Sequence, residues 1–206
     1  ALLDRRLAAE GTSLRAVLDG VRRELAERHL RDPGVSPGEI AFLCDIALPQ
    51  VGVVTNIGTV HAERAGSQEA IAHGKSELVQ ALPADGHAIL NFDDPWVRKM
   101  EEKTRAHVFF YGLSPDAMLR GEDIRADWPN RLSLTVSHQG ESVRVQTQIC
   151  GKHLVPNVLA AMAVGHVMGV SLDAAATAIG AMPPVEGRMF PIESPDGVTF
   201  ILDDVK

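Results

Sequence analysis

Short runs of apolar residues alternate along this chain with segments of helical periodicity, and this alternation limits the folds that the chain can adopt. The runs at 51–55, 87–91 and 108–111 have the continuous apolar character of strands that are covered on both faces. Helical spacing predicts helices at 36–48, 67–82 and 95–104, the first with Ser36 as its N-cap and Pro37 in its first turn. Helices that alternate with buried strands predict an α/β fold with a mostly parallel sheet and helices on both faces.

The pattern changes after Gly112. Leu132, Leu134 and Val136 alternate with polar residues, a turn is expected at 138–141, and alternation resumes as far as Ile149. This predicts an antiparallel hairpin extension of the sheet over 132–149. Alanine-rich helices are expected at 157–168 and 172–182, and two strand-like runs follow between 188 and 206.

Composition excludes several classes of function. The 206 residues have a net charge of -7, and no cluster of Lys and Arg forms the surface that nucleic acids need, so no nucleic-acid partner is expected. The chain has no apolar stretch of bilayer length and no signal-peptide core, so we expect a cytoplasmic protein that does not bind membranes. Cys44 and Cys150 lack zinc-site spacing and are expected to be core thiols.

Two residues near the first predicted strand could carry chemistry. His61 follows the strand at 51–55 through a short loop, and ligands of open α/β sheets bind beyond the carboxyl ends of strands. Lys75 lies within a predicted helix. The sequence Gly74-Lys75-Ser76 is not a phosphate loop, because that motif needs a glycine at position 69, where Glu69 stands. A loop-capping His61 and a solvated Lys75 are the structural alternatives.

Three further candidates follow the hairpin. Asn157 opens a predicted helix and, on sequence alone, is expected to be its N-cap. Arg188 follows a double proline, and Asp204 stands with Asp203 at the end of a predicted strand. An arginine suits phosphate groups and a carboxylate suits ribose hydroxyls, although each signal is weak by itself.

The order of many short motifs resembles the Mur ligase family, and most closely the branch that adds D-alanyl-D-alanine. The resemblance covers about 36–206. The matching motifs, in chain order, are Pro37-Gly38-Glu39-Ile40, 53–58 with His61, Lys75, Glu77-Leu78, Asn91 with Asp93-Asp94-Pro95, Gly151 with His153 and Asn157, and Glu186-Gly187-Arg188.

The resemblance implies an ATP-dependent amide ligase of peptidoglycan synthesis. Such an enzyme adds an amino acid or dipeptide to a UDP-N-acetylmuramoyl peptide through an acyl phosphate. It also implies a central ATP-binding domain over 36–187 and the first strands of a truncated C-terminal domain over 188–206. A separate helical segment is expected over 1–35.

The implied cofactors are ATP and Mg2+, with His61 and Lys75 as metal ligands and Lys75 carried as a carbamate. Asn157, Arg188 and Asp204 match nucleotide-binding positions of the family. The helix that carries Lys75 begins at Ser67, shortly after His61, and must run back along the sheet, so we predict that Lys75 is turned inward and lies beside His61 at one end of the sheet. Such burial favours the neutral amine that adds carbon dioxide.

One departure from the family bears on catalysis. No phosphate-binding Gly-Lys-Ser/Thr loop precedes Ser36, so the chain alone is expected to hydrolyse no ATP. A folylpolyglutamate or cyanophycin synthetase-like ligase, or a non-catalytic fragment that lacks the phosphate loop, therefore remain alternatives.

Overall fold

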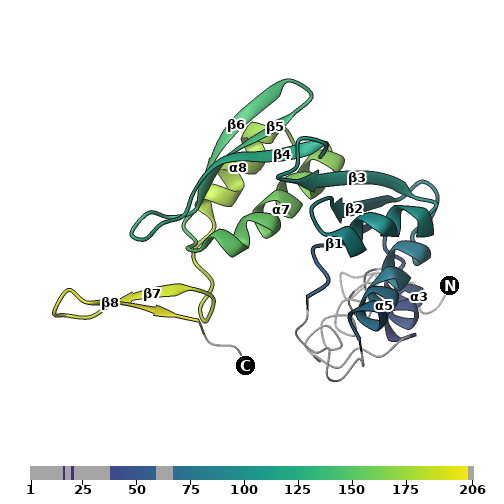
Figure 1. The fold of residues 1–206 in the computed structure, drawn as a ribbon, viewed down its shortest axis with the longest axis horizontal. Helices are drawn as coiled ribbons and strands as arrows, with labels where there is room; N and C mark the ends of the chain where they lie inside the picture. The colour runs from purple at the N-terminus through teal and green to yellow at the C-terminus, as the bar shows by residue number, and fades with distance from the viewer. Residues whose placement is uncertain (1–15, 17–19, 21–37, 59–66, 204–206) are drawn as a thin grey trace, which may run out of the picture. The chain divides into compact units, whose positions relative to one another are not determined.

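The computed structural model describes residues 16, 20, 38–58 and 67–203. Its main element is a mostly parallel six-stranded sheet whose strand order, β1-β2-β3-β4-β5-β6, follows the chain (Figure 1). The strands are β1 (Val51–Val54), β2 (His87–Asn91), β3 (His107–Gly112), β4 (Leu119–Arg125), β5 (Ser133–His138) and β6 (Glu141–Gln146). The predicted α/β class is confirmed.

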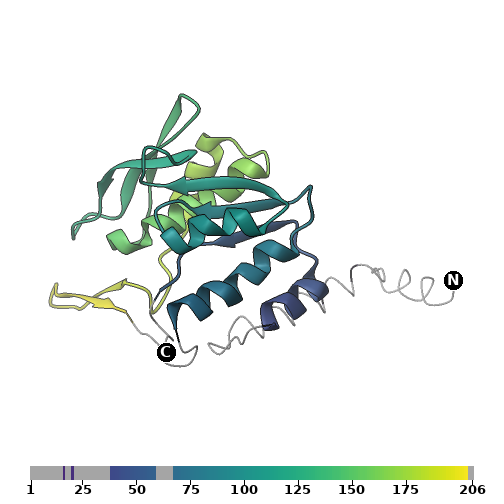
Figure 2. The same ribbon diagram turned by 45° about the vertical axis from the view of Figure 1, so that its right-hand side comes forward.

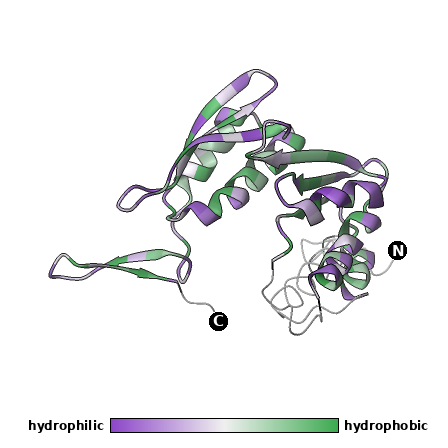
Figure 3. Ribbon diagram, viewed as in Figure 1, coloured by the Kyte–Doolittle hydropathy of each residue, from purple (hydrophilic) through white to green (hydrophobic). Residues whose placement is uncertain are grey.

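The central strands are buried as their composition predicts. Ala88, Ile89 and Leu90 of β2 are fully buried, and Figure 3 shows this strand as mainly hydrophobic. In the described residues no helix is both long enough and apolar enough to cross a membrane.

One compact unit contains α3 (Glu39–Ala47), α5 (Gln68–Ala81) and the short 3-10 helix η1 (Lys99–Lys103). Helices α3 and α5 pack against each other (Figure 2). Ser67 is the N-cap of α5, because its hydroxyl accepts a hydrogen bond from the N–H of Ala70 at 3.1 Å.

The predicted N-cap of α3 is wrong. The helix begins at Glu39 with Gly38 as its N-cap at φ 89°, and Ser36 and Pro37 lie outside the described residues. The carboxylate of Glu77, from α5, accepts the N–H of Gly38 at 2.6 Å and that of Ala41 at 3.1 Å. A side chain from another helix thus satisfies the first turn, so no local cap is needed.

The second compact unit contains the extension of the sheet, α6 (Pro95–Arg98), α7 (Val155–Val167) and α8 (Leu172–Ala181). Strand β4 pairs with β3 in parallel, and β5 pairs with β4 and β6 in antiparallel fashion. The predicted hairpin is therefore confirmed. Its turn consists of Gln139 and Gly140, both with positive φ (49° and 87°).

Helices α7 and α8 pack on this extension. The core of this unit includes four fully buried side chains: Leu134, Val136 and Val145 of the sheet and Met162 of α7. Gly121 of β4 allows the close approach of α7, because a Cβ atom there would lie 3.1 Å from Leu159. A second, two-stranded sheet pairs β7 (Phe190–Glu193) with β8 (Thr199–Leu202), as the two strand-like runs predict.

Two helix boundaries differ from the prediction. The helix expected at 95–104 divides into α6 and η1. Helix α7 follows directly on η2 (Lys152–Leu154) and has Leu154 as its N-cap, so Asn157 lies in its first turn and the N-cap prediction for Asn157 is wrong. Pro156 accounts for this boundary, because proline fits the first turn of a helix, where its missing N–H has no partner to lose.

Candidate functional site

Polar side chains fix the carboxyl ends of the first three strands. The amide of Asn91 donates to the carbonyl of Thr55 at 2.8 Å, and its oxygen accepts the N–H of Asp93 at 3.0 Å. The carboxylate of Asp93 accepts the N–H groups of Leu113 and Ser114 at 2.6 Å and 3.0 Å. This edge of an open α/β sheet, where ligands bind, is therefore held in one arrangement.

Negative charge gathers at the same edge. Burial, with the nearby carboxylates of Asp93 and Asp94, raises the pKa of Tyr111, so its phenol stays neutral. Asp94 is the cap of α6, since its carboxylate accepts the N–H groups of Trp96 and Val97 at 2.9 Å and 3.0 Å.

Lys75 lies in the middle of α5 and is half-buried. Its neighbour Ser76 is fully buried and donates to the carbonyl of His73 at 2.6 Å. The start of α5 is tied to the segment after β1, because the amide of Gln68 donates to the carbonyl of Ile57 at 2.8 Å. The inward orientation of Lys75 toward the magnesium side of the site stays a prediction.

His61 lies outside the described residues, so its position beside Lys75 stays a prediction. Within the ranges that the structure describes, no three His, Cys, Asp or Glu side chains form a group that could hold a metal ion. Of the two predicted magnesium ligands, His61 and Lys75, the structure therefore describes Lys75 alone.

Asn157 and Arg188, which the sequence separates by thirty-one positions, line one pocket of about 290 Å3. The other lining residues are mainly apolar and come from the end of the β5–β6 hairpin, from α7, and from α8 and the segment after it: Thr147, Ile149, Leu154, Val158, Ala161, Ile179, Met182, Pro183 and Val185. Apolar walls with one amide and one guanidinium suit a flat heteroaromatic ring that carries an anionic group.

Hydrogen bonds within the hairpin segment, and from this segment to α8, border this pocket. The hydroxyl of Thr147 donates to the carbonyl of Leu132 at 2.8 Å, and the amide of Gln148 donates to the carbonyl of Gly180 at 3.2 Å. A Cβ atom on Gly180 would lie 2.9 Å from the carbonyl oxygen of Gln146, so a glycine is needed for this approach.

The carboxylate predicted for the ribose is not described, since Asp204 lies outside the described residues. Its neighbour Asp203 accepts the N–H of Met189 at 3.3 Å, within the β7–β8 hairpin. The structure therefore brings together two of the three predicted nucleotide-binding residues, Asn157 and Arg188.

Sequence reasoning missed the apolar walls of the pocket and the contact made by Glu77. The walls come from segments that are far apart in the chain, so no local pattern could reveal them. A weak signal existed in the apolar residue Val185, which stands beyond the end of the helix predicted over 172–182.

An open sheet with a fixed carboxyl edge, together with an apolar pocket that holds an amide and a guanidinium, defines an α/β protein with a candidate site for a small ligand. The chain belongs to the Mur ligase family, whose middle domain matches residues 35–165.

Named relatives agree with this family. The UDP-N-acetylmuramoyl-tripeptide--D-alanyl-D-alanine ligase of Mycobacterium bovis is 38% identical over 182 residues, which are 88% of this chain and 34% of that protein. The chain thus spans about a third of the length of this relative.

Solved structures show the same fold. The MurF structure from Acinetobacter baumannii superposes with a TM-score of 0.74 at 25% identity, over 82% of this chain and 36% of that one. The MurF ligase of Thermotoga maritima in complex with ADP superposes with a TM-score of 0.70 at 25% identity, over 82% of this chain and 39% of that one.

Proposed function

We propose that this chain is the central ATP-binding part of a ligase that adds an amino acid or a dipeptide to a UDP-N-acetylmuramoyl peptide. The observation that carries the proposal is the pocket in which Asn157 and Arg188 meet. The relatives are ligases of this kind, and one structural relative is a complex with ADP. We assign 36–187 to the central domain and 188–206 to the first strands of the C-terminal domain. The helical segment predicted over 1–35 lies, apart from residues 16 and 20, outside the described residues.

The reaction proceeds in two steps. A carboxylate of the UDP-linked peptide attacks the γ-phosphorus of ATP, so that ADP leaves and an acyl phosphate forms. The incoming amine then attacks the acyl carbon and loses a proton, and inorganic phosphate leaves as the amide bond forms. In the first step the chain must hold ATP with its γ-phosphate at the carboxylate.

The nucleotide roles follow from the pocket. The amide of Asn157 can both donate to and accept from the polar edge of adenine, while the apolar walls cover its faces. Arg188 offers a planar fork of donors to phosphate oxygens. Asp204 is assigned to the ribose hydroxyls from the resemblance.

Lys75 and His61 are assigned to the magnesium side of the site. When bound, Mg2+ offsets the negative charge of the phosphates. A lysine carbamate presents two anionic oxygens, which a hard cation prefers to an ammonium group. The partial burial of Lys75 supports this role, because burial favours the neutral amine that adds carbon dioxide.

The test is ligation by the full-length protein. Lys75→Ala should abolish phosphate release driven by ATP, a UDP-N-acetylmuramoyl peptide and the amine substrate, and added short carboxylates should restore part of it. Lys99→Ala, which removes an exposed lysine of η1, is the matched control and should retain activity.

Full activity of the Lys75→Ala protein would disprove the assigned role. Phosphate release driven by a folyl substrate, or by an acidic polypeptide, instead of the muramoyl peptide would favour the alternative ligases. A full-length wild-type protein that is folded but inactive with every substrate would favour a non-catalytic chain.

A further inference from the structure

The antiparallel extension has two unlike faces. On β5, Leu134 and Val136 point into the core and are fully buried, so Ser133, Thr135 and Ser137 lie on the opposite face. The register places residues of the neighbouring strands beside these hydroxyls: Arg125 and Gln146 beside Ser133, Glu122 and Arg144 beside Thr135, and Arg120 and Ser142 beside Ser137. The outer face is therefore rich in hydroxyl groups and arginines.

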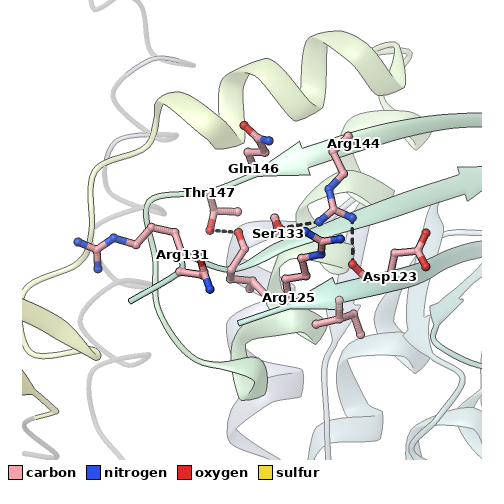
Figure 4. Close-up of a pocket in the computed structure, with 10 residues that line it drawn as sticks. Asp123, Arg125, Arg131, Ser133, Arg144, Gln146 and Thr147 are labelled. Carbon is pink, nitrogen blue, oxygen red and sulfur yellow. Dashed lines mark hydrogen bonds between the residues drawn. The ribbon is translucent and has the colours of Figure 1, made fainter. Parts of the chain in front are cut away.

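A pocket of about 880 Å3 opens at this part of the sheet (Figure 4). Three arginines line it, Arg125 from β4, Arg131 from the loop before β5, and Arg144 from β6. Figure 4 shows the side chains of Arg125 and Arg144 next to each other, whereas that of Arg131 points away from them. Asp123 is the one carboxylate among the lining residues, and the others are neutral: Ile124, Asn130, Leu132, Ser133, Gln146 and Thr147. The lining thus has a surplus of positive charge in a chain whose net charge is -7.

Neutral groups hold Arg144 in place. Its guanidinium donates to the hydroxyl of Ser133 at 2.7 Å, to the carbonyl of Asp123 at 2.9 Å and to the hydroxyl of Thr135 at 3.3 Å. Figure 4 shows the first two of these bonds. None of these acceptors carries charge, and the hydroxyl of Thr135 in turn donates to the carboxylate of Asp123 at 3.4 Å. The guanidinium of Arg144 is thus oriented without forming an ion pair among the described residues.

The other two arginines also lack carboxylate partners. Arg131 donates to the sulfur of Cys150 at 2.6 Å and lies over the ring of Trp128, with its guanidinium carbon 5.1 Å from the ring centre. Among the residues that the structure describes, neither Arg125, Arg131 nor Arg144 forms an ion pair, whereas Arg120 pairs with Glu122 at 3.2 Å.

We propose that this arginine pocket binds a small anion that carries two or more phosphate groups. Guanidinium forks match phosphate oxygens in pairs, and the hydroxyl and amide groups between the arginines supply further donors. The volume is that of a site for a whole small molecule rather than a single phosphate. This pocket shares Thr147 alone with the apolar pocket of Asn157, so the proposal does not depend on the proposed ligase function.

The experiment uses tripolyphosphate as the probe and the 206-residue chain with Trp96→Phe as the host. This substitution leaves Trp128 as the reporter, because the sequence has two tryptophans. The stacking of Arg131 on Trp128 links the pocket to the fluorescence of that ring. We expect a saturable fluorescence change, and calorimetry on the same sample should give the same affinity.

Arg125→Gln is the decisive variant, because the Arg125 side chain forms no hydrogen bond or ion pair with the described residues. It should weaken tripolyphosphate binding by about tenfold, the usual effect of losing one charged hydrogen-bond donor. Arg144→Gln should weaken it further, with circular dichroism as the check on folding. Arg105→Gln, an exposed arginine outside the pocket, is the matched control and should bind as the host does.

Four outcomes would overturn the proposal. Three are the absence of saturable binding, unchanged affinity in Arg125→Gln, and equal binding of citrate, which carries similar charge on carboxylates. Asn157→Ala should leave tripolyphosphate binding unchanged, and a loss there would place the probe in the apolar pocket instead and contradict the proposal.

Discussion

Glu77 joins two helices that are far apart in the sequence. Its carboxylate accepts the N–H groups of Gly38 and Ala41 at the start of α3, at 2.6 Å and 3.1 Å. We expect Glu77→Gln to lower the free energy of unfolding by about 1 to 2 kcal/mol, because a charged acceptor at a helix N-terminus is replaced by a neutral one. Urea denaturation measures this difference.

The control for Glu77 is Glu101→Gln, which removes a carboxylate from an exposed position of η1. It should change the free energy of unfolding by less than about 0.5 kcal/mol. Equal effects of the two substitutions would show that net charge, and not the contact with α3, is responsible.

We expect His166 to make the stability of the fold depend on pH. Its ring packs edge-to-face against His138 at 4.3 Å and lies tilted against Phe109 at 5.3 Å between ring centres. Burial, and then the neighbouring His138, lowers the pKa of His166, an effect that Glu141 opposes in part. The folded state therefore binds a proton less readily than the unfolded state, so stability should fall as the pH drops below the ordinary histidine pKa of about 6.5.

Melting temperatures measured between pH 8 and pH 5 test this expectation. His166→Gln should flatten the loss of stability on the acid side, whereas His73→Gln, at an exposed position of α5, should leave the slope unchanged. The same slope in all three proteins would contradict the assignment to His166.

At the scale of elements, the turn between β5 and β6 has two residues with positive φ. Gly140 is at 87° and Gln139 at 49°. Gly140→Ala should destabilise the fold by about 1 kcal/mol, because a side chain is disfavoured in this region of backbone space. Gln139→Asn is the matched change at the other turn position and should stabilise slightly, because asparagine tolerates positive φ. Destabilisation by both changes, measured by urea denaturation, would contradict the turn argument.

The elements that the sequence predicts well are those with a strong local pattern. The apolar run of β2, the Ser67 cap of α5 and the alternation of β5 and β6 each depend on neighbours in the chain. Strand β4 was not predicted, because its two buried residues are Leu119 and Gly121, and a glycine gives no hydrophobic signal. The packing of α7 requires that glycine, and packing of this kind is not visible in local sequence.

The candidate site follows the same division. Lys75, Asn157 and Arg188 could be chosen from the sequence because their motifs match a family in order. The pocket that brings Asn157 and Arg188 together depends on apolar residues of three separate segments, and only the fold assembles them. The arginine pocket was not predicted either, because the register of three strands decides which arginines share a face.

At the scale of the whole molecule, the proposed function depends on where the nucleotide binds. We infer that the apolar pocket of Asn157 and Arg188 holds the adenine end of the nucleotide. The test is calorimetric titration of ADP with Mg2+ into the full-length protein and into two variants, Asn157→Ala and Lys99→Ala. Lys99 is exposed on η1, lines neither pocket and serves as the control.

We expect saturable ADP binding that Asn157→Ala weakens by about tenfold and that Lys99→Ala leaves unchanged. ADP binding of wild-type strength in Asn157→Ala, or an equal loss of affinity in both variants, would contradict the assignment of this pocket to the nucleotide.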